Sequence, residues 1–168
     1  MAAWDSVARF ILMSAGSQGG KTSFGPHWLS REMGYDLAKR ASGEALGDYL
    51  AVTSTYDLFK LKMLPAIREL FESILGIGRW WALARILELR EGLSPQGQFW
   101  AVQQDDPMYG RIILSSADAL GGLESATANA AWLDELGQQA FTLDAFRAVR
   151  RRLTLSRGRI LGTTSLYG

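Results

Sequence analysis

The amino-acid sequence predicts an α/β domain with a mostly parallel central sheet flanked by helices. Two observations predict it. Short apolar runs alternate with helical patterns along the chain, and the first run, Arg9–Ser14, leads through a glycine-rich segment into an amphipathic pattern. With 168 residues, of which 48% are hydrophobic and 21% charged, the chain is long enough to bury a substantial core. We therefore expect residues 1–168 to form a single globular domain.

Five strands are predicted from apolar runs of strand length. In chain order they are Arg9–Ser14, Asp48–Ser54, Arg111–Ser115, Ala130–Leu133 and Arg159–Thr163. The first is a continuous apolar run, which is typical of a strand buried on both faces. Because helical patterns separate most of these runs, we expect the strands to pair mainly in parallel.

Helices are predicted where apolar residues recur every three or four positions. The first covers about Lys21–Arg40. The second covers Tyr56–Leu75, and Pro65 either kinks it or marks its start. Trp80–Leu89 also has a helical pattern, and Thr142 is expected to cap the last helix of the chain.

Composition excludes several kinds of site. The chain has no cysteine, which excludes disulfides and thiolate zinc sites, and its single histidine, His27, excludes a multi-histidine metal site. Eighteen Lys and Arg residues against 17 Asp and Glu leave a formal charge of +1, so bulk charge does not support nucleic-acid binding, although a local patch is compatible with it. No signal peptide or membrane span is evident. We expect a soluble intracellular protein.

The segment AGSQGGKT, Ala15–Thr22, has the pattern of a phosphate-binding P-loop. In such a loop, backbone N–H groups at a helix N-terminus surround the phosphates, and glycine permits both the backbone angles and the close approach. Lys21 would reach the β- and γ-phosphates, and the Thr22 hydroxyl would bind Mg²⁺. The strict pattern has glycine where this chain has Ala15. The apolar strand before the loop and the helix after it favour a P-loop over a simple glycine turn.

A second pattern, AAWLDE, ends an apolar run in two carboxylates, Asp134 and Glu135. Downstream of a P-loop this is the Walker B arrangement, in which the first carboxylate helps to hold Mg²⁺ and the second orients and deprotonates the attacking water. An acidic pair after an apolar run is common by itself and is usually just solvated. Its place after the P-loop is what indicates a site.

A third pattern, GRILGTTS, is a short strand that ends in hydroxyl side chains. In P-loop ATPases, a polar residue at the end of the strand beside the P-loop commonly contacts the γ-phosphate or the attacking water. Thr163 and Thr164 are the candidates for that contact. Spacing alone leaves open a Thr/Ser turn that merely closes the strand.

The order of these three patterns resembles the ATPase domain of the large terminase subunit, the DNA-packaging motor of tailed phages. The shared elements are a P-loop written AG-x-x-GGKT, an apolar strand ending in WLDE, and a later GRILGTTS. Three further stretches agree: FGPHWLSREM, DYLAVTSTYDLFKLKMLP and LESATANAAWLDELGQ. The resemblance covers essentially the whole chain, and the combination is much more specific than any one motif.

The resemblance implies an additional-strand P-loop ATPase of the catalytic-glutamate type, which hydrolyses ATP with Mg²⁺ and drives viral DNA into a capsid. It implies that Lys21 and Glu135 are catalytic and that Thr22 and Asp134 bind the metal. The nucleotide-binding residues that it implies are Gly16, Ser17, Gln18, Gly19, Gly20, Lys21 and Thr22. The coupling motif, which links hydrolysis to movement, would consist of Thr163, Thr164 and Ser165.

The same resemblance implies double-stranded DNA, a portal protein and the small terminase subunit as partners, with a homo-oligomeric ring as the assembled state. It implies action in the host cytoplasm, without a membrane and outside the mature virion. The chain ends soon after the coupling motif, so we expect it to lack the lid and the C-terminal nuclease domain, and nuclease activity with them. Many terminases carry an arginine in the P-loop where this chain has Ser17.

Two alternatives stay open at this point. Arg151 and Arg152 are candidates for an arginine finger offered to a neighbouring subunit, whereas a solvated basic face is the favoured explanation of the run. At the level of function, the chain is either a packaging ATPase, another P-loop DNA-translocating ATPase, or a nucleotide-binding assembly module that is catalytically silent alone. ATP binding and ATP turnover, measured separately, distinguish these functions.

Overall fold

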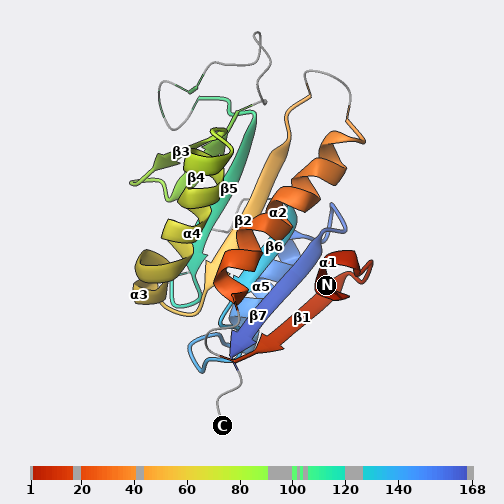
Figure 1. The fold of residues 1–168 in the computed structure, drawn as a ribbon, viewed down its shortest axis with the longest axis vertical. Helices are drawn as coiled ribbons and strands as arrows, with labels where there is room; N and C mark the ends of the chain where they lie inside the picture. Colours follow the sequence, from red (N-terminus) through yellow and green to blue (C-terminus); the bar gives the residue numbers. More distant parts are fainter. Residues whose placement is uncertain are drawn as a thin grey trace.

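The computed structural model of the protein describes residues 2–16, 20–40, 44–90, 100–101, 103, 106–119 and 127–165. Its centre is a seven-stranded sheet with the strand order β1-β7-β6-β2-β5-β4-β3 (Figure 1). The strands are β1 (Phe10–Ala15), β2 (Gly47–Thr53), β3 (Gly78–Trp81), β4 (Ile86–Leu89), β5 (Gly110–Ser116), β6 (Ala128–Asp134) and β7 (Arg159–Ser165). From β1 to β5 in that order the neighbours pair in parallel, and β4 and β3 extend the sheet antiparallel. The expected α/β class with a mostly parallel sheet is confirmed.

Helices cover both faces of the sheet (Figure 1). On one face lie α2 (Lys21–Leu37) and a helical segment made of α3 (Tyr56–Leu58), η1 (Phe59–Met63), α4 (Leu64–Arg68) and η2 (Glu69–Ile74), where η marks π-helical hydrogen bonding. On the other face lies α5 (Leu143–Arg152), and a short helix, α1 (Ala2–Asp5), precedes β1. In the part of the chain that the structure describes, no helix is long and apolar enough to cross a membrane.

Each face of the sheet has its own apolar core. Trp28 and Leu29 of α2 pack with Ile67 of α4 and with apolar side chains of the strands. On the opposite face, Ala145 and Val149 of α5 pack against another set of strand residues. The predicted cap of α5 is present, because the Thr142 side chain accepts a hydrogen bond from the Ala145 N–H at 3.2 Å.

The stretch Trp80–Leu89 is a β-hairpin, so the helix predicted there was wrong. β3 and β4 pair antiparallel, and β4 pairs in turn with β5. Alanine, leucine, arginine and glutamate favour a helix locally, but pairing with the free edge of β5 outweighs that preference. The two strands also bury their aromatic and aliphatic side chains against the helices, with Leu87 fully buried and Trp80 packed beside it.

The strand β1 lies at an edge of the sheet, so the prediction that it is buried on both faces was also wrong. Within the described residues it pairs only with β7. Phe10 is 45% exposed and Leu12 66% exposed, whereas Ile11 is buried. A continuous apolar run does not distinguish a central strand from an edge strand, because strand order is set by pairing partners far away in the chain.

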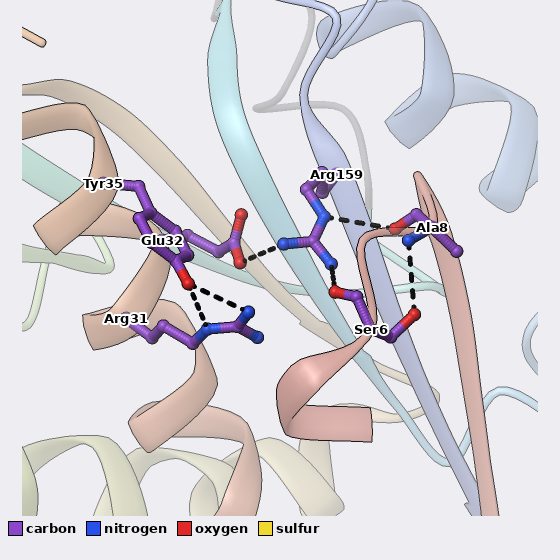
Figure 2. A network of polar contacts seen from close by, with 6 residues as sticks. All are labelled: Ser6, Ala8, Arg31, Glu32, Tyr35 and Arg159. Carbon is purple, nitrogen blue, oxygen red and sulfur yellow. Dashed lines mark hydrogen bonds and ion pairs between the residues drawn. The ribbon is translucent and has the colours of Figure 1, made fainter. Parts of the chain in front are cut away.

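A polar network ties the segment before β1 to the rest of the domain (Figure 2). The Arg159 guanidinium, at the start of β7, donates to the Glu32 carboxylate of α2 at 2.7 Å and to the backbone oxygens of Ser6 and Ala8. Burial raises the pKa of Glu32, while the nearby charge of Arg159 acts in the opposite direction. Three elements are therefore joined through one arginine.

The position of β7 in the sheet determines which strand ends lie next to one another. β7 lies between β1 and β6, and the register pairs Ala15 of β1 with Ser165 and Leu133 of β6 with Gly162. The carboxyl ends of these three parallel strands therefore meet at one edge of the sheet, where open α/β sheets bind ligands. The N-terminus of α2, the acidic pair at the end of β6 and the hydroxyl-rich end of β7 lie together there.

Candidate nucleotide-binding site

The loop after β1 leads into the N-terminus of α2. Gly20 has φ +69°, a left-handed conformation that favours glycine, and it precedes α2 without a side-chain cap. The side chain of Lys21 is buried, and its Nζ donates to the backbone oxygens of Ala15 at 2.8 Å and of Gly16 at 2.6 Å. The ammonium group is therefore drawn into the loop, where it would lie beside a bound anion. Three of the predicted contact residues, Ser17, Gln18 and Gly19, lie outside the described residues.

A chain of hydrogen bonds joins α2, β6 and β7. The Thr22 hydroxyl donates to Asp134 Oδ2 at 3.3 Å, and the Thr163 hydroxyl donates to Asp134 Oδ1 at 2.7 Å. The indole N–H of Trp132 donates to Thr163 Oγ1 at 3.0 Å, which fixes the orientation of that hydroxyl. Both oxygens of the Asp134 carboxylate are thus held by hydroxyl groups from neighbouring elements.

The carboxylate of Asp134 is almost completely buried, with 1% of the residue exposed. Burial raises the pKa of Asp134, the hydrogen bond from Thr163 lowers it, and the charge of Glu135 raises it further. The desolvation of a carboxylate is unfavourable unless a cation or several donors compensate it. A desolvated carboxylate with hydroxyl oxygens beside it is therefore suited to holding a cation.

Hydrogen bonds from the end of β7 hold the turn after β6 in place. Glu135 is 5% exposed and has φ +54°, unusual for a residue with a side chain. Its two carboxylate oxygens accept from Ser165, Oε1 from the hydroxyl at 3.2 Å and Oε2 from the backbone N–H at 3.4 Å. The N–H of Gly137 donates to Thr164 Oγ1 at 3.0 Å. A Cβ at Gly137 would lie only 2.5 Å from that oxygen, so glycine permits the close approach.

A further contact, which the sequence analysis missed, holds the same turn from the side of β2. Ser54, directly after β2, donates from its hydroxyl to Gln138 Oε1 at 2.7 Å. Ser54 is fully buried. The sequence feature that could have indicated this contact was the position of Ser54 at the end of a predicted strand, which lies next to β6 in the sheet. The role of Trp132 was missed as well, because the indole of a strand residue gives no sequence sign of the hydroxyl that it contacts.

The residues present fit Mg²⁺ as the cation. Thr22 and Asp134 supply a hydroxyl and a carboxylate oxygen from adjacent elements, and Mg²⁺ is usually held by one or two carboxylates together with substrate phosphates. Among the described residues there is no group of three or more His, Cys, Asp and Glu side chains that would hold a metal by itself.

The predicted arginine candidates lie apart from this cluster. Arg151 and Arg152 occupy the last turn of α5, from which the chain passes through residues 153–158 to the start of β7 at Arg159. The last turn of α5 is therefore near the amino end of β7, opposite the N-terminus of α2 and the carboxyl end of β6 (Figure 1). The trans role of these two arginines stays a prediction.

Solved structures with the same arrangement are known. The ATPase domain of the large terminase of Thermus phage P74-26 matches 99% of this chain and 63% of its own length, with a TM-score of 0.65 and 19% identity. The large terminase of a thermophilic bacteriophage matches with a TM-score of 0.60 and 9% identity over 96% of this chain and 36% of its own. The fold is that of a large terminase ATPase domain.

A third large terminase, that of bacteriophage HK97, matches with a TM-score of 0.59 and 15% identity over 94% of this chain and 29% of its own. The chain thus spans less than two thirds of the length of each of these three proteins. The second of the three, from the thermophilic bacteriophage, has been solved with ATP-γ-S and with ADP. No protein-family model matches the sequence, and no curated protein does. Resemblance at the level of sequence motifs and likeness of fold therefore agree.

Proposed function

We propose that this chain is the ATP-hydrolysing part of a terminase-type DNA-packaging motor. The observation that carries the proposal is the chain of contacts from Thr22 through Asp134 to Thr163, with Glu135 beside it. It brings the expected P-loop, Walker B pair and coupling motif to one edge of the sheet. The fold shared with large terminase ATPase domains supports the same function.

Each residue of the candidate site has a proposed role that follows from its position. The N-terminal amides of α2 and the ammonium of Lys21 would bind the β- and γ-phosphates, because unpaired N–H groups and a cation favour anions there. Thr22 and Asp134 would hold Mg²⁺, which, when bound, neutralises charge that develops on the phosphates. The hydroxyl of Thr163 keeps the Asp134 carboxylate turned toward Thr22.

Glu135 is the proposed general base. Its carboxylate would accept the proton of the water that attacks the γ-phosphate, and general bases of this kind typically contribute about 10²–10⁴-fold to the rate. The hydroxyl and N–H of Ser165 orient both carboxylate oxygens. Because Ser165 ends β7 and the base follows β6, a displacement of β7 would change the orientation of the base. This arrangement supports the assignment of residues 163–165 as the coupling motif.

The wider assembly follows from the same proposal. The partners would be double-stranded DNA, a portal protein and the small terminase subunit, and the motor would be a homo-oligomeric ring that acts in the host cytoplasm. The chain would contribute the ATPase part of that motor, since it spans 63% of the P74-26 ATPase domain and smaller shares of the two longer terminases.

The test measures nucleotide binding and turnover separately in the same protein. We expect Lys21→Ala to lose both. Glu135→Gln should bind a slowly hydrolysed ATP analogue normally in titration calorimetry but turn over ATP at least about 100-fold more slowly. Glu44→Gln, which removes an exposed carboxylate between the C-terminus of α2 and the amino end of β2, is the matched control and should leave turnover unchanged.

Equal turnover by Glu135→Gln and the unaltered protein would show that the assigned base is wrong. Normal binding with negligible turnover by the unaltered protein would instead favour the alternative function, a nucleotide-binding assembly module. Chelation of Mg²⁺ with EDTA should abolish turnover in either active protein, since Thr22 and Asp134 would otherwise face the phosphates without a cation.

A further inference from the structure

Basic residues concentrate in one part of the chain. Residues 147–159 contain six of the 18 Lys and Arg residues and no Asp or Glu, although the formal charge of the whole chain is only +1. The other helical segments mix the two signs. For example, Lys60 and Asp57 form an ion pair at 3.6 Å, and Arg68 and Glu72 form another.

Four of the six arginines of this segment are exposed at the surface. α5 buries Ala145 and Val149, and its exposed side carries Arg147, Arg150 and Arg151. Arg157 is exposed in the turn that follows α5. Arg9, which precedes β1, is exposed at the same turn and donates to the backbone oxygens of residues 153 and 158. We call these five residues the arginine surface: Arg9, Arg147, Arg150, Arg151 and Arg157.

Most of this charge has no acidic partner in the described part of the chain. Arg147 forms an ion pair with Asp144 at 3.2 Å, and both side chains are exposed. Arg150, Arg151 and Arg157 form no ion pair with any described residue. Uncompensated like charges on adjacent residues repel one another, and an anionic partner would relieve that repulsion.

Helix stability explains only part of the arrangement. Cations in the last turn of a helix interact favourably with the helix dipole, which accounts for Arg150 and Arg151. Arg157 lies beyond the helix and has φ +54°, where glycine or asparagine would be the usual residue. Arg9 comes from the opposite end of the chain. Neither of them is explained by the dipole of α5.

We propose that the arginine surface binds the phosphate backbone of duplex DNA. Guanidinium groups match phosphate oxygens in geometry, and a run of unpaired cations complements a strand of regularly spaced phosphates. The inference deepens the proposed function, and rests on it for the choice of duplex DNA among polyanions. It assigns to Arg151 a contact with DNA, instead of a contact with the nucleotide that is bound by a neighbouring subunit.

The position of the surface connects it to the candidate site. The segment that carries the arginines leaves the site at Glu135, runs down α5, turns at residues 153–158 and returns along β7 to Ser165. Its two ends contact each other, because Ser165 donates to the Glu135 carboxylate. DNA bound at the turn would therefore touch the one stretch of chain that joins the proposed base to the residue that orients it, without obstructing the nucleotide.

The experiment measures the affinity of the full chain for a fluorescein-labelled random duplex by fluorescence anisotropy between about 50 and 200 mM NaCl. The test variant is Arg150→Ala/Arg151→Ala/Arg157→Gly, in which glycine suits the left-handed φ at position 157. We expect roughly tenfold weaker binding, and a salt slope that falls by about 0.9 for each phosphate contact removed. Replacement of the same residues by lysine should keep most of the slope.

The control variant Lys60→Ala/Lys62→Ala removes two exposed cations from η1 and should leave DNA binding unchanged. Unchanged affinity and slope in the triple variant, equal weakening by the control, or no DNA binding by the unaltered protein would each overturn the proposal. ATP turnover of the unaltered protein, measured without DNA, reports a failure of the proposed ATPase function separately from DNA binding. Loss of turnover in Arg151→Ala with normal DNA binding would instead support the trans arginine role.

Discussion

Gly25 marks the closest approach of α2 to β6, and Gly25→Ala tests how tightly the two elements are packed. A Cβ at this position would lie 2.0, 2.3 and 2.4 Å from three ring atoms of Trp132. Carbon atoms in contact are normally about 3.5–4.0 Å apart, so the ring or the helix would have to move by more than about 1 Å. Trp132 has little freedom to move, because it is fully buried and its indole N–H is bonded to Thr163.

The expected loss of stability follows from two opposing terms. Overpacking of a tight core typically costs about 1–3 kcal/mol, and the severity of this overlap places it at the upper end. Replacement of glycine by alanine inside a helix returns about 1 kcal/mol. Gly25→Ala should therefore lower the free energy of unfolding by about 2 kcal/mol. ATP turnover should fall with it, since α2 carries Lys21 and Thr22 into the candidate site.

Gly34→Ala is the matched control on the same helix. Gly34 is exposed, and a Cβ there would have no atom within 4 Å. This variant should gain about 0.5–1 kcal/mol, because only the helix preference changes. Urea unfolding of both variants, read by tryptophan fluorescence, gives the comparison. If Gly25→Ala were as stable as Gly34→Ala, the packing of α2 on β6 would be looser than these distances imply.

Two further predictions concern the polar contacts. Ser165→Ala removes the hydroxyl donor to Glu135 but leaves the backbone N–H. The kcat of ATP turnover should therefore fall by about tenfold, as for the loss of one charge-assisted hydrogen bond, with KM little changed and kcat recovered in Ser165→Thr. An unchanged kcat would show that Ser165 does not orient Glu135. Burial raises the pKa of Glu32 in the folded state, so folding favours the protonated form of this side chain. The free energy of unfolding that Glu32 contributes at low pH is therefore lost as the pH rises through the raised pKa. Urea unfolding at several pH values should therefore show that the free energy of unfolding of the unaltered protein falls relative to that of Glu32→Gln as the pH rises. The opposite slope would contradict a raised pKa of Glu32.

The motifs and the main strands could be predicted from the sequence because their signals are local. The five predicted strands agree with the observed ones to within two residues at each end, since each is a short apolar run between glycine-rich or polar segments. The cap at Thr142 was equally local. Where a signal depends only on neighbouring residues, the sequence is sufficient.

The errors and omissions arose where distant parts of the chain decide the outcome. The β3–β4 hairpin has helix-favouring residues and becomes a hairpin by pairing with β5. The edge position of β1 follows from strand order. The contact between Ser165 and Glu135 depends on β7 lying beside β6. None of these pairings leaves a pattern in a single sequence.

The order of strands has a consequence for how the protein is made on the ribosome. The strand β1 pairs within the described chain only with β7, and the Arg9 side chain donates a hydrogen bond to the backbone oxygen of Gly158, 149 positions away. Until the final strand leaves the exit tunnel, the strand before the loop has no partner, and such long-range pairing is slow and exposed to aggregation. The candidate site therefore cannot form until β7 has been synthesised, and a nascent chain interrupted before residue 159 would be unable to form it.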